Sequence, residues 1–111
     1  MLYEMKLKNE PFNSIKKGQK KVEMRLYDEK RKLLKIGDCI EFTNISNNEK
    51  IKVEIINLCV FANFDELYSF FNKTDLGYEE NEMAIPRDME KYYSKEEQKM
   101  SGVVGIVIKL I

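Results

Sequence analysis

Histidine is absent from this chain of 111 residues, and its absence removes whole classes of chemistry. Without an imidazole the protein cannot use Ser-His-Asp or Cys-His catalysis, and the usual histidine-containing zinc sites are excluded as well. Any chemistry must come from lysine, glutamate, aspartate, tyrosine, serine or threonine. We therefore expect neither a metal site nor a cofactor.

Cysteine is scarce, and so are long apolar runs. Cys39 and Cys59 fall in predicted strands, which favours two buried, reduced thiols over a disulfide. No apolar run approaches the roughly 18 residues needed to cross a bilayer, and Glu4 and Lys6 interrupt any signal-peptide core. We expect one domain over residues 1–111, cytoplasmic, monomeric and without a membrane partner.

The net charge is zero, so the overall field is not that of a strong nucleic-acid binder. The distribution is uneven, however. Residues 1–36 hold 11 Lys/Arg and 5 Asp/Glu, whereas residues 37–111 hold 8 and 14. The basic excess of the first third is either the chance outcome of a highly charged composition or an electrostatic footprint for an anion.

The basic part of the chain centres on residues 16–26, a lysine-rich turn followed by an alternating segment. Val22, Met24 and Leu26 share one face of the predicted strand, and Lys21, Glu23 and Arg25 share the other. The charged face is either solvated or the floor of a binding site. Lys20 is in phase with the apolar residues, so it reaches the charged face only if the strand begins after it.

Alternating or β-branched apolar residues predict strands over 2–8, 20–26, 39–43, 50–62 and 102–111. The apolar phase of the fourth strand changes near Ile56 and Asn57, which predicts a bulge there. In the last strand, Gly102 or Gly105 marks a bend or a close approach by other atoms. Gly37 suits a turn that needs a positive φ.

Capping residues and helical spacing predict short helices over 9–17, 63–71, 86–93 and 94–100, with a helical turn over 28–34. Asn9 and Asn63 are the expected N-caps. Leu33, Leu34 and Ile36 are expected to point inward. Strands thus lie at both ends of the chain, and helices precede the last strand. This order predicts an α+β fold, mainly β, forming a small mixed-to-antiparallel barrel with helices between the first and second strands and before the last.

Two motifs carry a resemblance to a known family. The Gly18–Lys20–Glu23–Arg25 pattern and the Gly37-Asp38 turn resemble the signature of the ASCH domain, and the glycine-rich last strand resembles small stand-alone bacterial members. The resemblance covers nearly the whole chain. It implies a PUA-like β-barrel and an RNA-associated role, with a cleft for a nucleotide.

Glu23 and Arg25 suit such a role because residues two apart on a strand leave the same face. A guanidinium binds phosphate or a base edge, and a carboxylate binds an exocyclic amine. Neighbouring lysines would hold phosphates and a tyrosine would stack on a base. The predicted RNA- or nucleotide-binding residues are Lys17, Lys20, Lys21, Glu23, Arg25, Arg31 and Tyr93.

One branch of the superfamily removes the acetyl group of N4-acetylcytidine with a lysine, a threonine and a glutamate. By this resemblance the lysine maps onto Lys20, the threonine position is occupied by Glu23, and the glutamate lies among Glu79, Glu80 and Glu82. The candidate catalytic residues are therefore Lys20, Glu23, Glu79 and Glu82.

Three hypotheses for the function remain from the sequence. The first is binding of RNA or a modified nucleotide, the second is amidohydrolase activity on N4-acetylcytidine-type nucleosides, and the third is a translation-related protein-interaction module that uses the acidic residues 75–99. Against all three stand simpler alternatives: an exposed Glu23–Arg25 pair of little energetic value, a solvated charge run at 28–35, and a packing role for Tyr92 and Tyr93.

Overall fold

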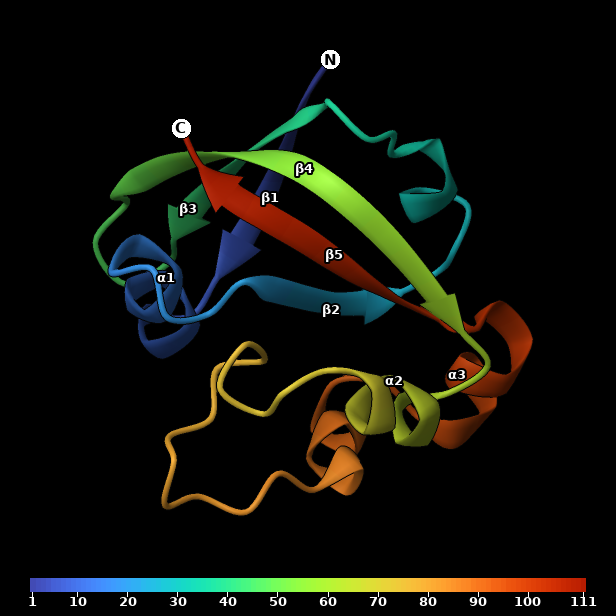
Figure 1. Cartoon of the computed structure of the whole chain (residues 1–111). Coiled ribbons are helices and arrows are strands. Elements are labelled where there is room, and N and C mark those ends of the chain that lie inside the picture. The colour runs from blue at the N-terminus through green and yellow to red at the C-terminus, as the bar shows by residue number, and fades with distance from the viewer.

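A five-stranded sheet organises the chain, and the computed structural model describes all of residues 1–111 (Figure 1). The strands are β1 (Leu2–Leu7), β2 (Val22–Leu26), β3 (Cys39–Asn44), β4 (Lys50–Phe61) and β5 (Val103–Leu110). The helices are α1 (Asn9–Lys16), α2 (Phe64–Phe70) and α3 (Lys95–Ser101), with the 3-10 helices η1 (Arg31–Leu33) and η2 (Pro86–Lys91). The predicted order of elements is confirmed. None of the helices is long and apolar enough to cross a bilayer.

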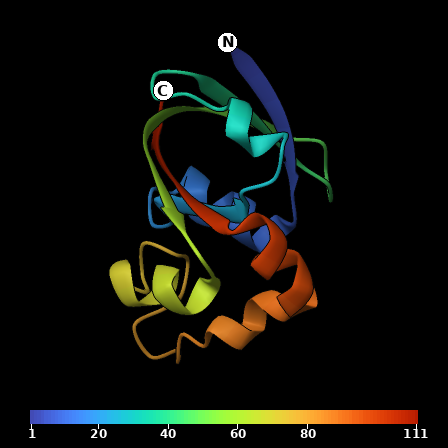
Figure 2. The same ribbon diagram turned by 90° about the vertical axis from the view of Figure 1, so that its right-hand side faces the viewer.

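The sheet has the strand order β1-β3-β4-β5-β2. Strands β1 and β3 are parallel, and every other pair of neighbours is antiparallel. Figures 1 and 2 show that the sheet is curled, with α1 joining its two edge strands, β1 and β2. The predicted α+β, PUA-like fold is confirmed, in the form of a half-barrel that is open between β1 and β2.

Apolar side chains form two clusters on opposite faces of the sheet. One fills the inside of the curl and includes the fully buried Phe12, Ile40 and Phe42. The other lies between β2 and the helical layer, where Leu67 of α2 is fully buried. Complete burial of such a side chain stabilises the fold by about 1.5–3 kcal/mol, so both layers are held mainly by apolar contact.

Strand β4 contains the predicted bulge. Its register against β5 shifts between Ile55 and Asn57, which adds one residue and bends the strand. Strand β5 is also approached closely, as predicted. A Cβ atom built at Gly105 would lie 2.6 Å from Cε2 of Phe71, so this glycine allows the helical layer to pack directly on the sheet.

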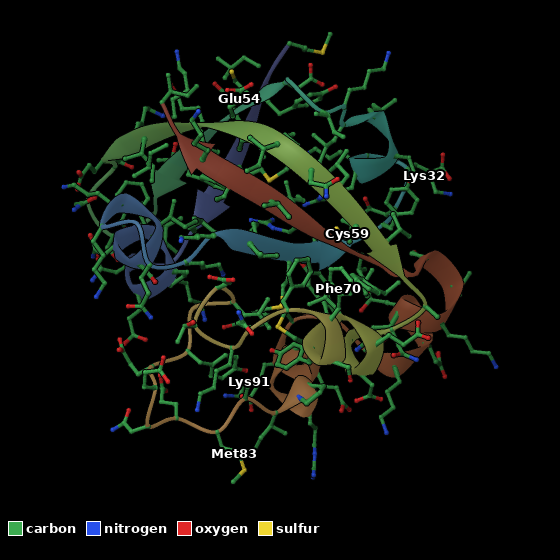
Figure 3. The ribbon with its side chains drawn as sticks, viewed as in Figure 1. Lys32, Glu54, Cys59, Phe70, Met83 and Lys91 are labelled. Atoms are coloured by element: carbon green, nitrogen blue, oxygen red, sulfur yellow. The ribbon has the colours of Figure 1, made fainter.

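Several local predictions are wrong. The N-cap of α1 is Lys8, because the side chain of Asn9 instead accepts hydrogen bonds from Asn13 and Asn44. Leu33 and Ile36 are exposed, since η1 is too short to turn more than Leu34 into the core. The two cysteines are free but only half-buried. Cys39 lies opposite Glu54, on the side of β3 that faces away from the buried Ile40, and Figure 3 labels Cys59 on β4.

Candidate functional site

The charged face of β2 points into the half-barrel. Glu23 lies opposite Ile106 and Arg25 lies opposite Val104, and both apolar partners belong to the cluster inside the curl. Residues opposite one another in an antiparallel ladder share a face. Glu23 is only 4% exposed. The interpretation of this face as solvated is therefore wrong.

Glu23 is held between two cations. Its Oε1 lies 3.1 Å from the Lys20 Nζ, and its Oε2 accepts a 2.8 Å hydrogen bond from the Arg25 Nε. The side chains of Lys20, Glu23 and Arg25 are 10%, 5% and 15% exposed. Because β2 begins at Val22, Lys20 is free of the strand's alternation and turns toward Glu23. We call these three residues the charged cluster.

Arg25 also connects the two edges of the sheet. Its Nη2 donates a 3.2 Å hydrogen bond to the carbonyl oxygen of Lys6 on β1. No ladder joins β1 to β2, so this side chain takes the place of a backbone bond across the open seam. The guanidinium is thereby fixed at both ends, by Glu23 and by Lys6.

The charges of the cluster stabilise one another. Burial by itself raises the pKa of Glu23, but Lys20 and Arg25 outweigh it and hold that pKa below its usual value of 4.5. Burial by itself lowers the pKa of Arg25, and the Glu23 carboxylate more than compensates, so this pKa is raised. Glu23 and Arg25 are consequently both ionised at neutral pH.

A cavity of about 480 Å³ lies beside the cluster, between the β1–β2 seam and residues 76–93. Binding pockets for small molecules usually measure roughly 300–1,000 Å³. The charged residues of its lining are Lys6, Lys8, Glu10, Lys20, Glu23, Arg25, Glu82, Asp88 and Lys91. Four tyrosines complete the polar lining: Tyr68, Tyr78, Tyr92 and Tyr93. The cavity thus offers both charges and aromatic rings.

Tyr93 lies at the junction of the cavity and the apolar layer. Its ring stacks on Phe64 with a centroid distance of 6.1 Å and an interplanar angle of 21°. Burial raises the pKa of Tyr93, although the nearby Arg25 charge opposes this effect. The hydroxyl therefore keeps its proton and can act as a donor. Its neighbour Tyr92 is exposed, with the Lys8 Nζ 5.3 Å from its ring centroid.

The structure brings together some of the predicted site residues and separates others. Those that line the cavity are Lys20, Glu23, Arg25, Glu82 and Tyr93. The exposed Lys17, Lys21 and Glu79 do not line it, and Arg31 instead pairs with Asp28 at 3.2 Å on η1. The backbone N–H of Glu79 donates to the Glu82 carboxylate. The binding and catalytic roles of all these residues stay predictions.

Sequence reasoning missed a second group of lining residues: Lys6, Lys8, Tyr68, Tyr78, Asp88 and Lys91. The alternation of β1 already placed Lys6 and Lys8 on its polar side, and that was the available signal. The helical spacing of Tyr68 with Phe64 and Leu67 favours a place in the core, against which it packs in part while also lining the cavity. Nothing in the sequence relates Tyr78 or Asp88 to β2, because only the folding of residues 71–93 under the sheet brings them there. Figure 3 labels Lys91 in this layer, and Met83 extends from its outer side into solvent.

No group of three or more Cys, Asp or Glu side chains is arranged like the ligands of a metal ion. The charged cluster would repel a cation, because its single carboxylate is already paired with two cations. Its chemistry suits a ligand that carries both acceptors and donors.

The chain belongs to the ASCH domain family, which it matches over residues 5–111. The family is generally linked to RNA binding. The resemblance inferred from the motifs around Lys20 and Gly37 is thereby confirmed. Among curated proteins the chain has no match.

Solved structures share the fold. The hypothetical protein PH0355 is 32% identical, with a TM-score of 0.84 over the whole of both chains. The protein PF0455 from Pyrococcus furiosus is 34% identical, with a TM-score of 0.74 over the whole of this chain and 98% of that one. An ASCH protein from Zymomonas mobilis is 14% identical, with a TM-score of 0.69 over 97% of this chain and 66% of that one, and it shows similarity of fold alone.

Proposed function

We propose that the protein binds single-stranded RNA, or a modified nucleotide, in the cavity beside the charged cluster. The observation that carries the proposal is the buried Glu23 carboxylate, held by Lys20 and Arg25 where the cavity meets the sheet. Each carboxylate oxygen has lone pairs left to accept a ligand N–H. Lys20 has further N–H donors for an acceptor of the same ligand.

The rim of the cavity supplies the remaining features of a nucleotide site. Lys6, Lys8 and Lys91 line it and are exposed, so they can approach phosphate groups without losing their hydration. Tyr92 presents a ring on which a base can stack. A phosphate at the rim and a base at the charged cluster would together span the cavity.

Fluorescence anisotropy with a short labelled single-stranded RNA tests the proposal at about 50 mM and 200 mM salt. We expect affinity to fall with salt. Lys8→Ala with Lys91→Ala should weaken binding at least severalfold, and Lys20→Ala with Arg25→Ala should abolish it. The matched control is Lys52→Ala, which removes an exposed lysine of β4 outside the cavity.

The Lys8/Lys91 double variant keeps the experiment decisive, because both lysines are exposed and their removal leaves the charged cluster and the core unchanged. Circular dichroism establishes whether the Lys20/Arg25 double variant is folded. Affinity that is independent of salt, or that survives both double substitutions in folded protein, contradicts the proposal.

Hydrolysis of N4-acetylcytidine-type nucleosides is a second candidate, favoured by the convergence of Lys20 and Glu82 on one cavity. Water would add to the acetyl carbonyl and lose a proton to the Glu82 carboxylate. Arg25 or Lys20 would stabilise the resulting oxyanion. Cleavage of the C–N bond then releases acetate, and the nucleoside amine takes up the proton.

Chromatography of N4-acetylcytidine incubated with the protein tests this candidate. We expect cytidine to form, with loss of turnover in Glu82→Gln and retention in the control Glu96→Gln, which changes an exposed residue of α3. Absence of turnover above the buffer rate at micromolar protein rejects hydrolysis and leaves the binding proposal unaffected.

A further inference from the structure

A network of three hydrogen-bonded side chains, Tyr68, Tyr78 and Asp88, forms a wall of the cavity that the charged cluster also lines. The Tyr78 hydroxyl donates to Asp88 Oδ2 at 2.8 Å, and the Tyr68 and Tyr78 hydroxyl oxygens are 2.9 Å apart. Tyr68 comes from α2, Tyr78 from the segment after it, and Asp88 from η2. All three line the cavity.

The number of hydroxyl protons fixes which side chain donates each hydrogen bond of this network. Tyr78 has one hydroxyl proton, and it is donated to Asp88 Oδ2. The bond between the two tyrosines is therefore donated by Tyr68. Burial raises the pKa of both hydroxyls, and for Tyr78 the bonds to Tyr68 and Asp88 raise it further. Both tyrosines keep their protons, and the direction is maintained at physiological pH.

The two ends of the network, Tyr68 and Asp88, can only accept further hydrogen bonds. The Tyr68 oxygen has used its proton, and Asp88 has one free oxygen and no Lys or Arg within salt-bridge distance. The Tyr78 hydroxyl is already satisfied as both donor and acceptor. The wall can thus accept hydrogen bonds from a ligand, whereas Lys20 and Arg25 of the charged cluster can donate them.

We infer that Asp88 and Tyr68 form a ribose subsite that selects ribonucleotides over deoxyribonucleotides. This inference rests on the proposed function. The Tyr68 oxygen and Asp88 Oδ2 are each hydrogen-bonded to the Tyr78 hydroxyl, at 2.9 Å and 2.8 Å. The two acceptors are therefore close enough to bind two adjacent hydroxyl groups of one ligand. The 2′- and 3′-hydroxyls of a ribose supply two neighbouring donors, and a 2′-deoxyribose lacks one of them.

The simpler interpretation is that the network only fastens residues 71–93 to α2. That role explains the Tyr78 hydroxyl, which links three elements. It does not require the half-buried Asp88 to lack a cation, nor Tyr68 and Asp88 to line the same cavity. A half-buried carboxylate without a cationic partner is stabilised by donors that arrive with the ligand.

Calorimetric titration with matched nucleotides tests the inference. The probes are the 5′-monophosphates of cytidine, adenosine and uridine, each with its 2′-deoxy form. We expect the ribose forms to bind roughly tenfold to a hundredfold more tightly than the deoxy forms, as for a hydrogen bond to a charged group. Uridine 5′-monophosphate should show that the preference does not depend on an exocyclic amine.

Asp88→Asn assigns the preference to this wall, since the asparagine oxygen can still accept from Tyr78. We expect the ribonucleotide affinity to fall toward that of the deoxy form, so that the two substitutions, in protein and in ligand, are strongly non-additive. Tyr68→Phe should produce a smaller loss of the same kind. The control Glu96→Gln, exposed on α3, should leave every affinity unchanged.

The outcomes separate the two proposals. Equal affinity for ribose and deoxyribose forms, or an equal loss for both in Asp88→Asn, overturns the ribose subsite and leaves nucleotide binding intact. A preference that follows the exocyclic amine also overturns it. Failure of every nucleotide and of single-stranded RNA to bind overturns both.

Discussion

The floor and the wall of the cavity are built from different parts of the chain. The floor consists of Lys20, Glu23 and Arg25 at the open edge of a sheet, where both faces of β2 are covered. The wall consists of Tyr68, Tyr78 and Asp88, which lie on short helices and an irregular segment under that sheet. The floor carries formal charges and the wall carries mostly neutral hydroxyls.

Because of this difference, we expect the floor to govern the stability of the fold and the wall to govern which ligand is bound. Ions buried in a sheet are expensive to leave unpaired, so the floor is a structural feature as much as a binding one. Hydrogen bonds at a half-exposed wall contribute less net free energy, because water can replace a partner that is removed. We therefore expect substitutions in the floor to destabilise the protein and substitutions in the wall to change mainly what it binds.

The largest effect is expected for Glu23→Ala. Loss of the carboxylate leaves Lys20 and Arg25 as buried cations without a counter-charge, which should lower the free energy of unfolding by about 3–5 kcal/mol. Urea denaturation measures it. The control is Glu29→Ala, because the Glu29 side chain is 95% exposed in its pair with Lys32, and it should give no measurable change. Equal results for the two variants would show that the floor is not structural.

A pH titration isolates the charge of the same residue. The pKa of Glu23 is lowered by folding, so its charged form stabilises the protein fully above the unfolded value of about 4.5. That stabilisation is lost as the pH falls through the lower folded pKa. The difference in unfolding free energy between wild type and Glu23→Gln should therefore shrink between pH 7 and pH 3. A difference that is constant with pH would contradict the assignment.

The smallest effect is expected in the wall, for Tyr78→Phe. The substitution removes a hydroxyl that accepts from Tyr68 and donates to Asp88, and it should cost about 0.5–1.5 kcal/mol. Thermal and urea denaturation measure it. Tyr92→Phe is the control, since the Tyr92 hydroxyl has no hydrogen bond within the protein and its side chain is exposed. A loss as large as that of Glu23→Ala would remove the contrast between wall and floor.

The elements of the fold were largely predictable because their signals are local. The phase change near Ile56 predicted the bulge of β4, and Asn63 caps α2 by accepting from the Glu66 N–H. The failures have two different origins. Asn9 is a good capping residue by type, but its side chain found a tertiary partner in the fully buried Asn44. Leu33 is apolar yet exposed, since nothing in a 3-residue helix decides which side is covered.

The sequence predicted which residues form the floor of the cavity, but it did not predict that they are buried. Two-residue spacing placed Glu23 and Arg25 on one strand face, and the start of the strand freed Lys20 to join them. Their burial could not be read from the pattern, because an alternating strand has the same sequence whether its polar face meets water or the open edge of a half-barrel. Residues 17, 21, 31 and 79 share the composition of site residues but lie outside the cavity.

The sequence by itself determined the ASCH family, the order of strands and helices, and the grouping of Lys20, Glu23 and Arg25. Each of these follows from the spacing of residues within short segments of the chain. Only the tertiary structure decided that Arg25 bridges the β1–β2 seam. It alone also decided that Tyr68, Tyr78 and Asp88 form a hydrogen-bonded wall of the same cavity. These arrangements depend on the curl of the sheet and on where residues 71–93 pack. Both are set by apolar contacts between distant segments, which no local pattern records.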